Sequence, residues 1–117
     1  KLSGNKNVFL MIADPVVANG VAFEQILRFS VSERVFLFVP AEALVKIGGV
    51  LGFKDDFEKT GQEMGKLANF ITSGEKSPAS IGIQYPEPAG FVINLKVANK
   101  LGFNIREEII KKAISVY

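Results

Sequence analysis

Runs of hydrophobic residues alternate with helical patterns along the first half of the chain. A continuous apolar run at residues 7–13, NVFLMIA, predicts a short strand buried on both faces. Residues 16–33 then repeat hydrophobic side chains at helical spacing, which predicts an amphipathic helix. A second buried strand is predicted at residues 34–40. A short helix at residues 41–49, ending at a glycine pair, and a weaker strand at residues 50–53 follow it.

The second half opens with the clearest helical pattern of the sequence, at residues 54–75. Asp55 or Asp56 can cap its start, where a carboxylate also meets the positive end of the helix dipole. Four hydrophobic residues near helical spacing predict the side that packs inward, namely Phe57, Met64, Leu67 and Ile71.

Alternating apolar residues predict a strand at residues 80–85, which a turn at PEPAG connects to another strand at residues 90–93. A short helix follows, capped by Asn94 and closed by Gly102. The end of the chain contains a further helix-start signal.

A last helix is predicted from Asn104, because Glu107 follows three residues later in the pattern of a capping box. This helix would carry its isoleucines inward. Short buried strands alternating with helices predict a single α/β domain over residues 1–117, with an open, largely parallel sheet in three layers.

Composition narrows the classes of function. The chain has 117 residues, 48% of them hydrophobic, and a net charge of +2 without any basic block, so nucleic acid is excluded as an expected partner. Cysteine and histidine are both absent. This excludes thiol nucleophiles, disulfides, nearly every zinc site and the usual general base, so we expect no enzyme, no cofactor and no metal.

The sequence contains no apolar run long enough to span a bilayer and no recognisable signal peptide. It begins at KLSGNKN without an initiator methionine, so we expect a processed or excised piece of a longer protein. The missing signal is therefore no evidence against export.

Open parallel sheets bind ligands at the carboxyl ends of their strands. This rule selects the loops at Asp14, at residues 40–42 and at residues 54–57. Asp14 could accept hydrogen bonds from a ligand, or it could form an Asx turn or a helix cap. Of Asp55 and Asp56, one is predicted to cap the helix and the other to be solvated, and a ligand contact from Asp56 stays open because of its loop. Glu42 is predicted to be a solvated residue at a helix start. Periodicity assigns Phe57 to the core.

Several motifs, in the expected order, resemble a family of ABC transporter substrate-binding proteins. FVINLKVANKLGFNIREEIIKKA is similar to the V-I-N-L-K-T-A-K-A-L-G ending of that family. DPVVANGVAFEQILRFSVSERVFLFVPAEALVKIGG is similar to its Asp-Pro stretch with F-E-x-L-L-R and S-E-A-L-V-x-x-G. DDFEKTGQEMGKLANFITSGEKSPASIGIQYP is similar to its D-Y-E-x-x-G-R-Q helix with I-L-x-G-E and V-E-x-P.

The resemblance implies part of the C-terminal lobe of a type I periplasmic-binding protein, in which two lobes clasp a small ligand. It implies an amino-acid-like ligand, because members of the family with identified ligands bind aromatic amino acids. It also implies an ABC permease as membrane partner and a periplasmic or other extracytoplasmic location. Carried over position by position, the implied ligand-binding residues are Asp14, Ala41, Glu42, Asp56 and Phe57.

The sequence also departs from the family pattern. Phe57 replaces a tyrosine and Ala41 a serine, which removes two hydroxyl groups, and Phe36 stands where the family often has proline. The resemblance covers only the last part of the family's chains, without the first lobe. The chain is therefore either a fragment or a shortened relative that completes its sheet by forming a homodimer through an exposed sheet edge.

Two functions follow from this reading. The first is the solute-binding component of an ABC importer, which binds its ligand without catalysis. The second is an interaction or sensory domain of the same fold that binds no ligand and acts through self-association. Thermal stabilisation by amino acids would favour the first function, and a tight dimer without such stabilisation would favour the second.

Overall fold

The computed structural model describes residues 7–117 and divides them into two compact units. Unit 1 comprises residues 7–54 and 90–117 of the described chain, and unit 2 comprises Asp55–Ala89. The β-sheet and most helices belong to unit 1. Each unit is described separately, and the prediction of one domain over residues 1–117 stays a prediction.

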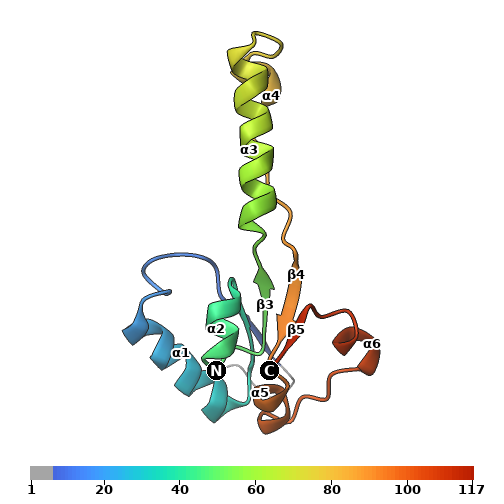
Figure 1. The fold of residues 1–117 in the computed structure, drawn as a ribbon. Helices are drawn as coiled ribbons and strands as arrows, with labels where there is room; N and C mark the ends of the chain where they lie inside the picture. The colour runs from blue at the N-terminus through green and yellow to red at the C-terminus, as the bar shows by residue number, and fades with distance from the viewer. Residues whose placement is uncertain (1–6) are drawn as a thin grey trace. The chain divides into compact units, whose positions relative to one another are not determined.

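Unit 1 is built on a five-stranded sheet whose strands lie in chain order, β1-β2-β3-β4-β5. Three neighbouring pairs are parallel, and the β3–β4 pair is antiparallel (Figure 1). The predicted open and largely parallel sheet is therefore confirmed. The strands are β1 Val8–Leu10, β2 Phe36–Val39, β3 Leu51–Lys54, β4 Gly90–Ile93 and β5 Ser115–Val116.

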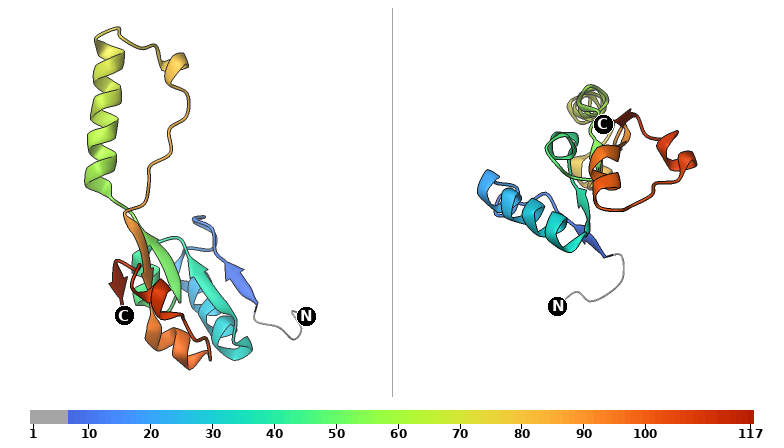
Figure 2. Two further views of the ribbon diagram at one scale, coloured as in Figure 1. Left: turned by 90° about the vertical axis from the view of Figure 1, so that its right-hand side faces the viewer. Right: turned by 90° about the horizontal axis from the view of Figure 1, so that it is seen from below.

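Helices cover both faces of this sheet, which gives the predicted three layers. α1 (Gly20–Glu33) and α2 (Glu42–Lys46) lie on one face, and α5 (Leu95–Lys100) and α6 (Glu107–Ile110) lie on the other (Figure 2). Right-handed crossovers between parallel strands place α1 and α2 on the same side. Because β4 runs antiparallel to β3, the same handedness places α5 and α6 on the opposite side.

Two hydrophobic clusters fill the spaces between these layers. The larger cluster lies under α1 and α2, and its buried residues are Met11, Phe23, Leu37, Val39, Val45 and Val92. The smaller cluster lies under α5, where Phe36 and Phe103 add an edge-to-face ring pair with centroids 5.2 Å apart. Its buried residues are Val50, Ala98 and Leu101.

The predicted first helix begins four residues later than expected, at Gly20 instead of residue 16. Asn19 is its N-cap, and the Asn19 side-chain oxygen accepts a hydrogen bond from the Ala22 amide at 2.9 Å. Helical spacing alone cannot show where the capping side chain lies, so the pattern extended the helix into the preceding turn.

The prediction that the first strand is buried on both faces is wrong. Phe9 and Met11 pack against the larger cluster, but the alternate side chains Val8, Leu10 and Ile12 are 65%, 63% and 67% exposed. Phe53, on β3, is 42% exposed and forms a ring pair with Phe38 at 5.3 Å. We call Val8, Leu10, Ile12 and Phe53 the open face of the sheet. Among the helices of unit 1, none lies over β1 on this side (Figure 2).

The helix after β4 follows its sequence signals closely. The Asn94 side chain accepts a hydrogen bond from the Val97 amide at 3.0 Å, and Gly102 follows the helix with a φ of +81°. Asn94 is 6% exposed and also donates its amide hydrogen to the Val45 carbonyl at 3.0 Å. One buried amide therefore caps α5 and ties it to the end of α2.

The prediction of a long last helix from Asn104 is wrong. α6 spans only Glu107–Ile110, and its N-cap residue Arg106 makes no side-chain capping bond. The chain then returns to the sheet as β5, where the Ile114 amide donates to the Phe91 carbonyl at 2.9 Å. Pairing with β4 therefore replaces the predicted continuation of the helix.

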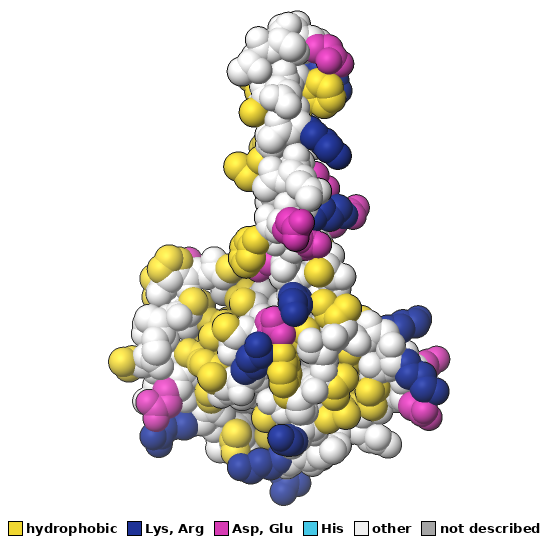
Figure 3. Space-filling model, viewed as in Figure 1, with side chains coloured by type: hydrophobic (Ala, Val, Ile, Leu, Met, Phe, Trp, Pro, Cys, Tyr) yellow, Lys and Arg dark blue, Asp and Glu magenta, His cyan; other side chains and the backbone are white. Residues whose placement is uncertain are grey.

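Unit 2 consists of α3 (Phe57–Thr72), α4 (Pro78–Ile81) and an irregular segment that leads to residue 89. Asp56 caps α3 as predicted, because its carboxylate accepts a hydrogen bond from the Lys59 amide at 2.9 Å. The predicted inward side of α3 is wrong, since no α3 residue is buried. Figure 3 shows charged side chains along one side of this helix and hydrophobic side chains along the opposite side.

The predicted strand at residues 80–85 is wrong, and so is the turn that would connect it to β4. Ser77 caps a short helix with Pro78 in its first turn, and this helix takes up residues 78–81. The following residues 83–88 make no backbone–backbone hydrogen bond to any part of the described chain. Pro86 and Pro88 lack an amide hydrogen, which removes two ladder donors from this segment.

Candidate functional site

The carboxyl ends of three parallel strands lie along one edge of the unit 1 sheet, because β1, β2 and β3 run in the same direction. Asp14 follows β1, and Ala41 and Glu42 follow β2. Three of the five predicted site residues therefore come from this edge. The other two, Asp56 and Phe57, belong to unit 2.

Asp14 forms an Asx turn. One oxygen of its carboxylate accepts a hydrogen bond from the Val16 amide at 2.7 Å, and its backbone carbonyl accepts from the Val17 and Ala18 amides. This was one of the two interpretations of Asp14 from the sequence. Only one carboxylate oxygen takes part in the turn, so the other remains available for a second hydrogen bond.

Ala41 is the N-cap of α2, with an extended backbone at φ −140° and ψ 149°. Its carbonyl accepts a hydrogen bond from the Leu44 amide at 3.1 Å, but alanine has no side chain that can cap a helix. The helix therefore begins without a side-chain cap.

Glu42 is the centre of a polar cluster, which corrects the prediction that it is a solvated residue. Its side chain is only 19% exposed. One oxygen accepts a hydrogen bond from the Tyr117 hydroxyl and lies 3.5 Å from the Lys46 ammonium, and the other oxygen lies 3.5 Å from the Lys54 ammonium. We call Glu42, Lys46, Lys54 and Tyr117 the Glu42 cluster. In Figure 3, charges of both signs meet among hydrophobic side chains on this side of unit 1.

These neighbours lower the pKa of Glu42 from its ordinary value of 4.5. The hydrogen bond from Tyr117 is the largest cause, and the charges of Lys46 and Lys54 act in the same direction. Partial burial opposes them, because burial disfavours the charged form of a carboxylic acid. Glu42 is thus an ionised and fully partnered acid, which makes it a poor proton donor or acceptor near neutral pH.

Tyr117, Lys46 and Lys54 are members of the cluster that sequence reasoning missed. Tyr117 is held by backbone bonds, since its amide donates to the Ile93 carbonyl and its carbonyl accepts from the Leu95 amide. The Lys46 ammonium lies 5.4 Å from the centre of the Tyr117 ring. Seventy-five residues separate Tyr117 from Glu42 in sequence, so no local pattern could have joined them.

Asp56 and Phe57 stand at the beginning of α3 in unit 2. Asp56 is engaged as the helix cap, whereas the Phe57 side chain is 80% exposed, which corrects its assignment to the core. An exposed aromatic ring beside the amino terminus of a helix is an apolar surface next to backbone amide groups that have no partner within the helix.

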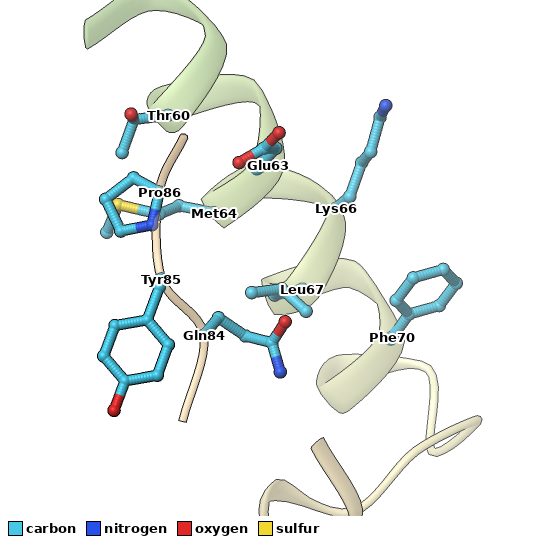
Figure 4. Close-up of a pocket in the computed structure, with 9 residues that line it drawn as sticks. All are labelled: Thr60, Glu63, Met64, Lys66, Leu67, Phe70, Gln84, Tyr85 and Pro86. Carbon is cyan, nitrogen blue, oxygen red and sulfur yellow. The ribbon is translucent and has the colours of Figure 1, made fainter. Parts of the chain in front are cut away.

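A groove of about 480 Å³ runs between α3 and the segment at residues 84–86 (Figure 4). Met64 reaches toward Pro86, Tyr85 points away from α3, and Lys66 points away from the segment. The groove is lined by Thr60, Glu63, Met64, Lys66, Leu67, Phe70, Gln84, Tyr85 and Pro86. Its volume lies in the range of small-molecule pockets, although no sequence signal had selected it.

An exposed ion pair connects α3 with the segment that leads to residue 89. The Lys59 ammonium lies 3.2 Å from the Glu87 carboxylate, and the Glu63 carboxylate lies 4.0 Å from the same ammonium. The hydrogen bond to Glu87 and the charges of Glu87 and Glu63 raise the pKa of Lys59. All three side chains are at least 45% exposed, so the pair contributes little stability.

The described residues contain no group of three or more His, Cys, Asp or Glu side chains that could hold a metal ion. Across residues 7–117, none of the helices combines the length and the apolar character that crossing a membrane would require. The groups described above are hydrogen-bonding groups, charged side chains and exposed apolar side chains, which are the groups that proteins use to bind small molecules.

The fold is an open, largely parallel α/β sheet, and proteins of this architecture bind ligands at the carboxyl ends of their strands, where three of the predicted residues lie. The sequence profile of the family described as "ABC transporter substrate binding protein" matches residues 1–117. The chain therefore belongs to that family. No curated protein matches the sequence.

Two solved structures have a similar fold. One is an ABC domain from Streptococcus pneumonia in complex with L-Trp, with 25% identity and a TM-score of 0.69 over 95% of this chain. The other is a conserved domain protein from Vibrio cholerae O1 biovar eltor, with 25% identity and a TM-score of 0.70 over 95% of this chain. The chain spans 37% and 36% of the lengths of those proteins.

Proposed function

We propose that this chain is part of the solute-binding component of an ABC importer and that it contributes half of a cleft for an amino-acid-like ligand. The match of the family profile over the whole chain carries this proposal. The Streptococcus structure with bound L-Trp supports an aromatic amino acid as the ligand class. The protein would act outside the cytoplasm and deliver its ligand to an ABC permease.

In this proposal, the ligand meets the chain at the predicted strand-end residues. The second oxygen of Asp14 would accept a hydrogen bond from the ligand's ammonium group, and Phe57 would offer its exposed ring to an aromatic side chain. Ala41, Glu42 and Asp56 would shape the binding site by fixing the starts of α2 and α3. Binding would involve no catalysis.

The test is a titration of the isotopically labelled full chain with L-tryptophan and L-phenylalanine, followed by amide chemical shifts in NMR spectra. This method detects weak binding, as expected when one chain supplies half of a cleft. We expect saturable shifts at the amides of residues 14, 16, 41, 42, 56 and 57. A titration with all common amino acids that moves no amide of the folded chain would refute the proposal.

The variant Asp14→Asn tests whether the negative charge of Asp14 contributes to ligand binding. Asparagine preserves the oxygen that accepts from the Val16 amide, so the Asx turn is kept while the charge is lost. We expect at least about tenfold weaker ligand binding, equivalent to about 1.4 kcal/mol. Glu33→Gln, at the end of α1, is the matched control and should leave the affinity unchanged. Unchanged affinity in Asp14→Asn would exclude Asp14 from the site.

A further inference from the structure

Glu42 has more cationic partners than its charge requires. One of its carboxylate oxygens lies 3.5 Å from the Lys46 ammonium, and the other lies 3.5 Å from the Lys54 ammonium. One negative charge thus meets two positive charges, so the side chains of the Glu42 cluster carry a net positive charge. Lys46 alone would neutralise Glu42, which leaves one cation in excess.

The two lysines differ in what else stabilises them. Lys46 lies one helical turn after Glu42 on α2, and its ammonium also lies 5.4 Å from the centre of the Tyr117 ring. A cation over an aromatic face is attracted by the ring. Lys54 comes from β3, and Glu42 is its ion-pair partner in the described chain. The excess positive charge of the cluster therefore belongs to Lys54.

Lys54 stands at the edge of the sheet where the ligand of an open α/β fold is expected. Of the Lys and Arg residues in the described part of unit 1, it is the one that ends a strand. Its side chain reaches from β3 to Glu42, which follows β2, and β2 is the neighbour of β1. The Lys54 ammonium therefore extends toward the side of the edge where Asp14 follows β1.

Contact with Glu42 fixes Lys54 without using all of its donors. An ammonium group has three hydrogens, so the contact with one Glu42 oxygen leaves a donor for a further acceptor. Glu42 is itself held by the Tyr117 hydroxyl, which donates a hydrogen bond to it. A lysine that is already held in place loses less side-chain entropy when a ligand binds.

We propose that Lys54 binds the carboxylate group of the ligand and that Glu42 and Tyr117 are positioning residues for its ammonium. This inference rests on the proposed function, in which Asp14 accepts a hydrogen bond from the ligand's ammonium. A free amino acid carries both charges, and this edge of the sheet carries one opposite charge for each. The site therefore selects amino acids with a free carboxylate over the corresponding amides and amines.

A comparison of L-tryptophan with L-tryptophanamide tests this role, because the two ligands differ only at the carboxyl group. Both carry an ammonium group at about pH 6, which lies below the ordinary pKa of an α-amino group. In NMR titrations of the full chain, we expect tryptophan to bind at least about tenfold more tightly than the amide. Equal affinities would overturn this inference alone, because binding of either ligand at the strand-end amides leaves the proposed function standing.

The variant Lys54→Met keeps the length of the side chain and removes its charge. It should weaken tryptophan binding about tenfold and leave the affinity for tryptophanamide unchanged, so the preference for the carboxylate is lost. Lys54→Arg keeps the charge and should retain the preference. Lys100→Met is the matched control and should bind both ligands as the wild type does. Lys100 lies in the last turn of α5, and α5 begins at the opposite edge of the sheet because β4 is antiparallel to β3.

The ratio of the two affinities distinguishes a charge effect from a change in the fold. If Lys54→Met weakens both ligands by the same factor, Lys54 acts through the fold and the inference is wrong. Tyr117→Phe removes the hydroxyl that holds Glu42 and should lower the preference for tryptophan about threefold. If no amino acid binds to the wild type, the proposed function is refuted and this inference is refuted with it.

Discussion

Glu42 shows how one side chain can connect separate parts of unit 1. It opens α2, accepts a hydrogen bond from the last residue of the chain, and pairs with Lys54 at the end of β3. A carboxylate with such partners is stabilised in its ionised form, and Glu42 has its pKa lowered accordingly. The charge of Glu42 is thus linked to the stability of the fold.

The direction of this pKa shift predicts the pH dependence of stability. Because folding lowers the pKa of Glu42, its contribution is fully present above its unfolded value of about 4.5 and is lost as the pH falls through the lower folded value. The thermal midpoint of the wild type should therefore fall more steeply below about pH 4.5 than that of Glu42→Gln. Parallel acid limbs in the two proteins would contradict this coupling. Glu33→Gln is the control.

The candidate site residues differ in how far away along the chain their partners lie. The carboxylates of Asp14 and Asp56 accept hydrogen bonds from amides only two and three residues away. The local sequence was therefore enough to predict the turn at Asp14 and the cap at Asp56. The partner of Glu42 lies 75 residues away, and its position depends on the pairing of β5 with β4. Local interactions were predictable, whereas contacts that depend on topology were not.

At the scale of elements, α2 begins without a capping side chain. Ala41 already has the extended backbone of an N-cap, so serine at this position could accept a hydrogen bond from the Leu44 amide without moving the chain. Ala41→Ser should raise the free energy of unfolding by about 1 kcal/mol, measured by denaturant unfolding. Ala41→Val is the matched control and should give no such gain. A serine variant no more stable than the wild type would show that α2 does not limit stability.

The elements predicted correctly are those whose boundaries are set by nearby groups. Asn94 and Gly102 bound α5 as their sequence signals indicated. The capping-box pattern at Asn104 failed because Phe103 and Ile105 pack as alternate residues against the cluster under α5, which holds the chain extended there. Full burial of one such side chain is worth about 1.5–3 kcal/mol against about 1 kcal/mol for a cap, so partial burial of these two side chains is enough to offset the lost cap.

At the scale of the whole molecule, the two units have different kinds of stability. Unit 1 has two buried clusters, whereas α3 in unit 2 has no buried residue. Local opening therefore needs less free energy in α3 than in the sheet. The open face and α3 both follow apolar patterns whose side chains are not buried within their own unit, so periodicity predicted the positions of the apolar side chains correctly and their burial wrongly.

Hydrogen exchange on the dilute, monomeric chain should resolve the two units. Ile93→Val removes one buried methylene from β4 and should cost about 1 kcal/mol, which accelerates the slowest amides of unit 1 about fivefold. The amides of α3 should exchange as they do in the wild type. If the α3 amides accelerate by the same factor, the chain unfolds as one cooperative body instead.

The pairing of Lys54 with Gly90 has a consequence for how this chain can change. These two residues face each other across antiparallel strands, and unit 2 leaves the sheet after one and returns at the other. In the sheet, residues 55–89 thus take the place of a hairpin turn. A short Asn-Gly turn, or a helical insert of another sequence, could replace them as a cassette while the order of the five strands stays the same.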